Sequence, residues 1–399
     1  MIKFIDLVAQ NGEVMADLEP VLEAIHARAS YIDGPQVESF EKAFAKFVGA
    51  RKAIGVASGT DALRLTLMAA GIGAGDEVIT TPSTFIATAE AVVQAGATPT
   101  LVEIDPKTGN MSPDALENYL SRHQWRSNNG PRAILPVHLY GQPADMSRFR
   151  ELADRYQLMV LEDACQAHGA RVRLGDEWKS AGSIGTAGCF SFYPAKNLGA
   201  WGDAGAVVTD DEELAARVLK LRNHGRLSHY AHEDCGYTAR LDTIQAAVLE
   251  AKLRRLPQWN ARRREIADLY AEALLESGVE VPEEPEGIES CYHLYVIRAA
   301  NRDAIRAELL TRKIECGIHY PVPLHLQPAL RMLGYRKGDF PESERMADSV
   351  LSLPMHPHMK DEEVAQVADA VTHACKQTHG LFAGGRATLQ AASPPRAAE

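Results

Sequence analysis

Cysteine and long apolar runs are both scarce in this chain of 399 residues. The cysteines are scattered and form no Cys-x-x-Cys pair, which argues against a disulfide scaffold and a cysteine-rich zinc site. No apolar stretch reaches the roughly 20 residues that a membrane helix needs. The N-terminus interrupts its apolar residues with Asp6, Glu13 and Asp17, unlike a signal peptide. We therefore expect a cytoplasmic protein without membrane partners.

Positive charge is also in short supply. Lysine and arginine number 42 against 53 aspartate and glutamate residues, which gives a formal net charge of −11. A surface with this balance repels phosphates, so the composition disfavours a nucleic-acid or anionic-membrane partner. The hydrophobic fraction of 46% and the charged fraction of 24% are ordinary for a soluble globular enzyme.

Short apolar runs alternate with amphipathic stretches in the first half of the chain. We predict strands at 53–57, 77–80, 100–104, 133–138, 159–162, 189–193 and 206–209, and helices at 61–70, 84–94, 113–120 and 148–156 between several of them. Such alternation favours an α/β fold with a largely parallel sheet covered on both faces. Ligands of such sheets bind outside the C-terminal ends of the strands.

The second half predicts a smaller unit. A helical pattern runs from residue 243 to about 276 and is broken or kinked at Pro257. A strand at 291–298 and a helix at 302–313 follow. We expect a large domain at 1–254 and a smaller C-terminal α/β domain at 255–382. Residues 383–399 are small and polar with two prolines, which predicts a disordered tail.

One strand-to-helix junction could bind an anion. The first predicted strand ends in Ser58-Gly59-Thr60 and a helix opens at once, so free N–H groups and a positive dipole end meet there. Gly59 would let the backbone approach a phosphate, and the hydroxyl of Thr60 could add a hydrogen bond. The alternative is that Ser58 or Thr60 only caps the helix. No Gly-Lys-Ser/Thr follows, so this is not a Walker loop.

Two carboxylates end another predicted strand. Glu162 and Asp163 follow four apolar residues, and charge at the end of a buried strand needs a partner. That partner could be a protonated pyridine nitrogen or an arginine. Gln166 and His168 follow within reach of the same edge, although either could satisfy loop backbone.

Lys196 lies in a glycine-rich turn between two apolar strands. Most lysines are solvated surface groups. At this position desolvation would lower the pKa of the amine and make it nucleophilic towards an aldehyde. Ser191 is close enough in sequence to contact a phosphate near the same lysine.

Histidines near the C-terminus invite a metal hypothesis, at positions 319, 325, 356 and 358. Prolines at 321, 323 and 357 exclude a helical i,i+4 ligand pair. We therefore expect no metal.

Six segments in order carry a family resemblance: SGTDAL, TPSTFIATAEAV, EDACQAHGA, FSFYPAKNLGAWGDAGA, RLDTIQAAVLEAKL and IHYPVPLHLQPA. Together they resemble the DegT/DnrJ/EryC1/StrS family of sugar aminotransferases, from about residue 4 to 380. The resemblance implies a pyridoxal 5'-phosphate (PLP) dependent transferase of fold type I. Such an enzyme has a mixed, mostly parallel seven-stranded sheet in a large domain, a smaller C-terminal α/β domain, and active sites shared within a homodimer.

The resemblance also assigns cofactor contacts. Lys196 corresponds to the lysine that carries PLP covalently, and Asp163 to the acid paired with the pyridine nitrogen. Phe85 corresponds to an aromatic residue stacked on the ring, the alternative being packing in a helix core. Phosphate contacts fall on Gly59, Thr60 and Ser191, and a contact with the ring or its hydroxyl falls on Gln166.

The resemblance implies that three further residues contact the partner subunit's cofactor or the substrate. Family members often have asparagine at the position of Thr238, where it reaches the neighbouring subunit's phosphate, so this shorter side chain departs from the pattern. Tyr320 and His325 correspond to positions near the sugar nucleotide. The HYPVPLHLQPA form suggests amination at C3.

The implied reaction is ping-pong transfer of an amino group from L-glutamate to a nucleotide-linked keto-sugar, with pyridoxamine 5'-phosphate as the intermediate form of the cofactor. The substrate would be a 3-keto-6-deoxyhexose on dTDP or a UDP-linked 3-keto sugar. A 4-keto-sugar or cyclitol aminotransferase stays open. A dehydratase branch of the family has the same fold and cofactor but carries histidine in place of the lysine. Lys196 therefore argues against a dehydratase here. A non-catalytic regulator would tolerate loss of Lys196 or Asp163, and both are present.

Overall fold

A seven-stranded sheet organises the protein. The computed structural model describes residues 1–122, 130–228 and 230–384. The strand order is β1-β9-β8-β5-β4-β2-β3, and all neighbours are parallel except β9, which runs antiparallel to β1 and β8. The strands are β1 (Lys52–Val56), β2 (Glu77–Thr80), β3 (Thr98–Leu101), β4 (Pro131–Ile134), β5 (Met159–Asp163), β8 (Ala187–Ser191) and β9 (Gly205–Thr209). The predicted mixed, mostly parallel α/β sheet is confirmed.

Two strands begin two residues earlier than the apolar runs predict. The runs at 100–104 and 133–138 correspond to β3 and β4, which begin at Thr98 and Pro131. Val102 remains buried after the last paired residue of β3, and Val137, beyond the end of β4, is buried in an isolated bridge to Asp163. Burial and strand pairing therefore end at different positions, and only burial is visible as an apolar run.

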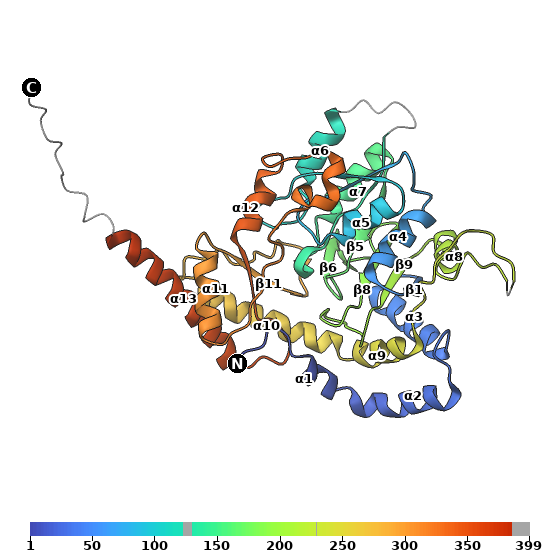
Figure 1. Cartoon of the computed structure of the whole chain (residues 1–399), viewed down its shortest axis with the longest axis horizontal. Helices are drawn as coiled ribbons and strands as arrows, with labels where there is room; N and C mark the ends of the chain where they lie inside the picture. The colour runs from blue at the N-terminus through green and yellow to red at the C-terminus, as the bar shows by residue number, and fades with distance from the viewer. Residues whose placement is uncertain (123–129, 229, 385–399) are drawn as a thin grey trace, which may run out of the picture.

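Helices cover both faces of the sheet (Figure 1). Helices α3 (Pro35–Val48) and α9 (Thr243–Leu253) pack on one face, and α4 (Gly59–Ala69) and α8 (Glu212–Leu221) on the other. Neighbouring residues of β8 point to opposite faces of the sheet. Phe190 packs in the core beneath α3 and α9, and Cys189 in the core beneath α4 and α8.

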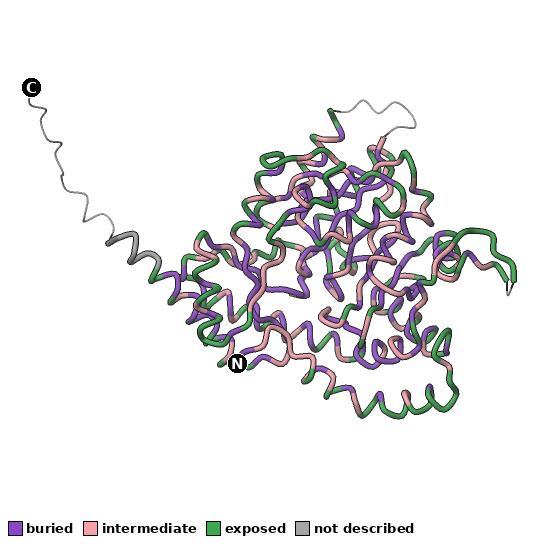
Figure 2. The backbone as a smooth tube through the Cα atoms, viewed as in Figure 1, coloured by how far each residue is buried: buried purple, intermediate pink, exposed green. Residues whose placement is uncertain are grey.

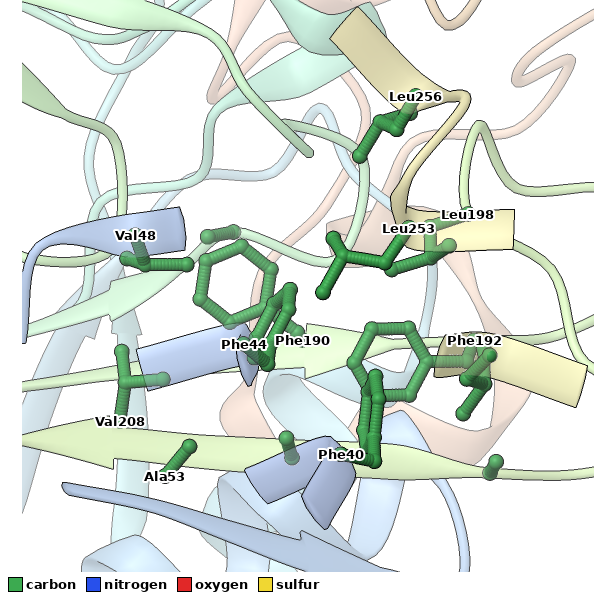
Figure 3. Packing of buried hydrophobic residues seen from close by; sticks show 14 of the residues in the cluster. Phe40, Phe44, Val48, Ala53, Phe190, Phe192, Leu198, Val208, Leu253 and Leu256 are labelled. Carbon is green, nitrogen blue, oxygen red and sulfur yellow. The ribbon is translucent and has the colours of Figure 1, made fainter. Parts of the chain in front are cut away.

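Aromatic packing fixes β8 against α3 (Figure 3). The ring of Phe44 lies edge-on to Phe190 and Phe192, with centroids 5.0 Å and 5.1 Å apart. All three side chains are fully buried. Edge-to-face aromatic pairs add stability beyond the area that they bury. This packing holds the strand that leads directly to the turn containing Lys196.

The remaining helices connect and flank the sheet. They are α1 (Leu7–Gly12), α2 (Met15–Arg28), α5 (Ala87–Gln94), α6 (Pro113–Arg122), α7 (Met146–Tyr156), α10 (Leu256–Leu274), α11 (Arg302–Thr311), α12 (Pro341–Ser349) and α13 (Asp361–Gly384). The helical pattern from residue 243 is interrupted as predicted. Pro257 lies in the first turn of α10, where its missing N–H costs no hydrogen bond. Helix α2 is largely exposed along its length (Figure 2).

A second core lies beyond residue 255. Helices α10, α11 and α13 enclose the antiparallel pair β11 (Tyr295–Arg298) and β12 (Val350–Leu353). We propose that this core defines the smaller domain at 255–382, with Ile2 of the large domain packed into it through a bridge to Ile314. Helix α13 continues to Gly384, two residues into the predicted tail, and residues 385–399 lie outside the described part of the chain.

A small sheet was missed by the sequence reading. Strands β6 (Arg171–Leu174) and β7 (Glu177–Ser180) form a hairpin, to which β10 (Ile288–Glu289) adds. The hairpin is rich in charged and exposed residues, so no apolar alternation marks it. Among the helices of the described ranges, none combines the length and apolarity needed to cross a membrane.

Lys252 connects three elements in the interior. Its side chain, on α9, is only 1% exposed. The ammonium donates hydrogen bonds to the carbonyl oxygen of Gly199, at 2.9 Å, and to Oε1 of Gln10, at 3.1 Å. Within the described residues it has no carboxylate partner, and desolvation lowers its pKa to about 8. Lys252 therefore ties α1 and α9 to the loop that follows Lys196 at the cost of a buried charge.

We predict that Lys252 makes stability rise with pH in a defined window. Its folded pKa of about 8 lies below the ordinary value of 10.5, so between these values the unfolded chain binds more protons. The free energy of unfolding of the wild type, minus that of Lys252→Met, should increase from pH 8 to 10.5, by at most about 3 kcal/mol. Urea denaturation across this range measures the difference. A constant difference would contradict the assignment.

Candidate active site

One cavity of ≈ 540 Å³ lies at the C-terminal ends of β1, β5 and β8. The family resemblance assigns cofactor or substrate contacts to ten residues. Eight of them line the cavity: Gly59, Thr60, Phe85, Asp163, Gln166, Ser191, Lys196 and Tyr320. The C-terminal ends of parallel strands lie at one edge of a sheet, which explains why positions so far apart in sequence converge.

The N-terminus of α4 forms one end of the cavity. Ser58 caps this helix, since its Oγ accepts a hydrogen bond from the N–H of Asp61 at 3.0 Å. The N–H groups of Gly59 and Thr60 belong to the first turn, where the helix itself provides no acceptor. Capping and anion binding are therefore compatible here, because the cap uses a different N–H group.

Gly59 is required by close packing. A Cβ at this position would lie 2.6 Å from Cβ of Ser191 and 3.0 Å from Sγ of Cys165. The helix N-terminus thus approaches the end of β8 as closely as the backbone permits. This brings the hydroxyl of Ser191 next to the first turn of α4, in a cradle suited to a phosphate.

Asp163 supplies negative charge to the cavity. It ends β5 and is 5% exposed. Its Oδ2 accepts a hydrogen bond from the hydroxyl of Thr88 at 2.7 Å, and its Oδ1 one from the N–H of Cys165 at 3.2 Å. Within the described ranges no cation pairs with it, so the carboxylate is oriented while its charge remains available to a protonated ring nitrogen.

Glu162 faces the opposite side of β5 and is structural. Its carboxylate accepts hydrogen bonds from Nε2 of His138, at 2.9 Å, and from three backbone N–H groups of the turn 182–185, at 2.6–2.8 Å. Nδ1 of His138 accepts from the N–H of Ala144, so the ring proton must be on Nε2. Hydrogen bonds therefore satisfy Glu162, and neither it nor Asp163 forms an ion pair with an arginine of the described chain.

Lys196 lines the same cavity as Asp163 and lies in the turn after β8. Its amine has no hydrogen bond to any described residue, and desolvation lowers its pKa below the ordinary 10.5. Its backbone is held by a hydrogen bond from its N–H to the carbonyl of Tyr193. A larger fraction of the amine is neutral, which is the form that attacks an aldehyde.

Aromatic side chains form another wall. Phe85 precedes α5 and is 52% exposed, so the alternative that it packs in a helix core is wrong. Its ring centroid lies 5.8 Å from that of Tyr320. Nε2 of Gln166 donates to the hydroxyl of Tyr320 at 3.2 Å, while its Oε1 accepts from the N–H of Tyr140 at 2.7 Å. Gln166 thus satisfies loop backbone and also orients a cavity residue.

The structure does not bring Thr238 or His325 to this cavity. Thr238 is exposed, at the base of a loop that projects from the body after α8 (Figure 1), and its hydroxyl lies 3.0 Å from Nε2 of His224. His325 is buried, with Nε2 3.0 Å from Glu344 and its ring against Phe340. His325 therefore faces α12 and lies outside this cavity of its own chain, and its expected contact with the substrate stays a prediction.

The sequence reading missed two histidines of the cavity wall. Burial lowers the pKa of His319 to about 4 and that of His293 well below 6.5, and the charge of Lys196 acts in the same direction. Both rings are therefore neutral near pH 7. His293 lies two residues after the buried Cys291 without any recognisable motif, and the sequence presents His319 only as a potential metal ligand. The described residues contain no cluster of three or more potential metal ligands.

A cofactor with a phosphate, a basic ring nitrogen and an aldehyde would find a complementary group at each point of this cavity. PLP is such a cofactor, and the fold and cavity define a PLP-dependent aminotransferase. More particularly, residues 14–372 match the profile of the DegT/DnrJ/EryC1/StrS aminotransferase family, so the chain belongs to that family.

Characterised relatives align over almost the whole chain. The chain is 40% identical to the "pleiotropic regulatory protein" of Geobacillus stearothermophilus, covering 93% of this chain and 97% of the relative. It is 42% identical to a dTDP-3-amino-3,4,6-trideoxy-alpha-D-glucose transaminase of Streptomyces venezuelae, covering 93% and 95%. It is 40% identical to a UDP-N-acetyl-3-dehydro-alpha-D-glucosamine 3-aminotransferase of Acidithiobacillus ferrooxidans, covering 93% and 97%.

A solved structure shows the same architecture. The chain superposes on S. venezuelae DesV, crystallised with a ketimine intermediate, with a TM-score of 0.89 at 42% identity. The match covers 94% of this chain and 98% of that chain. The predicted fold type, family and cofactor are therefore confirmed.

We predict that Gly59→Ala weakens PLP binding at least tenfold. The added Cβ would force Ser191 or Cys165 to move, and the first turn of α4 would lose its fit to a phosphate. Absorbance titration of cofactor-free protein with PLP measures the effect. Gly12→Ala is the matched control, because a Cβ there meets nothing within 4 Å. Equal affinities for the two variants would contradict the proposed cradle.

Proposed function

We propose that the protein transfers an amino group from L-glutamate to a 3-keto sugar linked to a nucleotide, either a 3-keto-6-deoxyhexose on dTDP or a UDP-linked 3-keto sugar. One observation carries the proposal: a lysine and an aspartate that form no ion pair with any described residue share one cavity with a helix N-terminus. The dTDP- and UDP-sugar transaminases among the relatives support the substrate class.

Each residue has a distinct task. Bound PLP supplies the electron sink that stabilises negative charge at the reacting carbon. Asp163 keeps the ring nitrogen protonated, which that sink requires. In the first half-reaction the Lys196 amine would take the α-proton of glutamate as general base and deliver it to C4′ of the cofactor as general acid. In the second it would move a proton the opposite way, from C4′ to the sugar carbon. Gly59, Thr60 and Ser191 hold the phosphate while the lysine is detached.

The aromatic wall contributes to the sugar site. Phe85 is exposed to the cavity and would stack on the cofactor ring, while the hydroxyl of Tyr320, oriented by Gln166, would contact the sugar nucleotide. Gln166 itself would contact the ring or its hydroxyl. His325 holds the segment after Tyr320 to α12 through Glu344 and so supports this wall from behind.

We also infer a homodimer in the cytoplasm. Thr238 is exposed and lies outside the Lys196 cavity of its own chain, which suits a contact with the phosphate in a neighbouring subunit. Six free cysteines suit a reducing compartment.

Visible spectroscopy and product analysis test the proposal. The holoenzyme should be yellow and bleach with L-glutamate, and 3-keto sugars on dTDP or UDP should restore the colour. Lys196→Ala should lose turnover, by at least about a hundredfold as expected for a general base. Lys179→Ala, at an exposed lysine, is the control.

Each outcome distinguishes a candidate. Recovery of colour only with 4-keto sugars or a cyclitol ketone would replace the proposed substrate. A protein that stays colourless with added PLP would instead support the hypothesis of a non-catalytic regulator. One relative is named a pleiotropic regulatory protein, which is consistent with that alternative. Full-rate amination by Lys196→Ala would overturn the assignment of the lysine.

A further inference from the structure

A chain of buried amides lies directly behind Lys196. Asn197, the next residue, is 1% exposed, and its Nδ2 lies 3.0 Å from Oδ1 of Asn260 and 2.9 Å from the carbonyl oxygen of Cys291. Its Oδ1 lies 3.3 Å from Nδ1 of His293. Asn260, on α10, approaches the carbonyl oxygen of His168 at 2.7 Å. The amides thus connect the lysine turn to a histidine of the cavity wall.

Backbone carbonyls fix the direction of every hydrogen bond in this chain. A carbonyl oxygen only accepts, so Asn260 must present its NH₂ group to His168 and its oxygen to Asn197. Asn197 must then present its NH₂ group to Asn260 and to the carbonyl of Cys291. Its oxygen is left for His293, so Nδ1 of that ring carries the proton.

The other ring nitrogen of His293 is consequently an acceptor. The side chain is 93% buried, as its exposure is 7%, and it lines the same cavity as Lys196. Nε2 has no hydrogen bond to any described residue. The titratable groups that act on the ring are Lys196, Arg263, His168 and His319. The guanidinium of Arg263 and the ammonium form of Lys196 are positive and oppose protonation of the ring.

Arg263 holds this arrangement in place. Its buried guanidinium donates to the carbonyl oxygens of Tyr292, at 3.1 Å, and Met355, at 2.8 Å, and reaches that of His293 at 3.5 Å. No carboxylate of the described chain pairs with it. The backbone of His293 is therefore anchored on one side and its ring on the other, so the direction of Nε2 is set by the fold.

We propose that His293 is a positioning residue, locked by Asn197 as the Nδ1–H tautomer, whose Nε2 accepts a hydrogen bond from the ammonium form of Lys196. The inference rests on the proposed function of Lys196 and extends it. When the amine has taken a proton, this acceptor holds the ammonium in the cavity and orients it for the next transfer. Because Asn197 follows Lys196 directly, one amide fixes both the turn and its acceptor.

Nitrogen NMR of the cofactor-free protein tests the tautomer without any reaction. In protein with ¹⁵N-labelled histidine at pH 7.5, the His293 signals, assigned by their loss in His293→Asn, should show protonated Nδ1 and unprotonated Nε2. The opposite tautomer or a doubly protonated ring would overturn the proposal. This result does not depend on whether Lys196 carries the cofactor.

A matched pair of variants tests the contact with Lys196. Asn at 293 keeps a donor for Asn197 but removes the distal acceptor, whereas Gln returns an acceptor near the position of Nε2. In cofactor-free protein labelled at lysine Cε, His293→Asn should lower the pKa of Lys196 by about one unit, the value of one hydrogen bond, and His293→Gln should restore part of it. An unchanged pKa in His293→Asn would overturn the proposed contact.

Kinetics separate positioning from folding. In the holoenzyme, His293→Asn should slow bleaching by saturating L-glutamate about tenfold and leave the KM for glutamate within about twofold, as for loss of one hydrogen bond in the transition state. Wild-type rates in His293→Asn would contradict the proposal while leaving the proposed function intact. A wild-type protein that never becomes yellow would contradict the proposed function, whatever the tautomer of His293.

Discussion

The amine of Lys196 is desolvated in the cavity and forms no ion pair with any described residue, and the site is organised around that desolvation. Burial lowers its pKa, and the histidines beside it remain neutral for the same reason. The two neighbouring carboxylates, Glu162 and Asp163, lie in different environments. Four hydrogen bonds satisfy Glu162 on the far side of β5, whereas Asp163 faces the cavity with its charge unpaired. A lysine and an aspartate with different environments can therefore act on one cofactor without neutralising each other.

The antiparallel strand β9 explains why the lysine lies there. β8 ends and β9 begins at the same edge of the sheet, so the connecting residues 192–204 cannot leave the edge where the parallel strands present their C-terminal ends. Packing of Phe190 and Phe192 against α3 fixes the start of this connection. Lys252 holds its far side through the carbonyl of Gly199. A parallel crossover at this point would have carried the turn away from the cavity.

Much of this arrangement could be predicted from the sequence, because burial leaves apolar runs and a helix start leaves a cap. The central strands, the junction at Gly59 and the lysine turn were all visible in this way. The hairpin β6–β7 was not, since it is mostly exposed and the third strand of its sheet, β10, lies more than a hundred residues away in sequence. The tautomer proposed for His293 depends on the side-chain amides of Asn197 and Asn260 and on the carbonyl oxygen of His168, which come from three separate segments. The position of His325 depends on packing against α12, a contact that its motif does not reveal.

The central claim is that PLP is bound through Lys196, and chemical trapping tests it most directly. Purified holoenzyme would be reduced with borohydride, digested and mapped by mass spectrometry. The account predicts a stable pyridoxyl adduct on Lys196, and no adduct after prior conversion with excess L-glutamate, which frees the lysine. An adduct on any other lysine, or none at all in protein that is visibly yellow, would contradict the account.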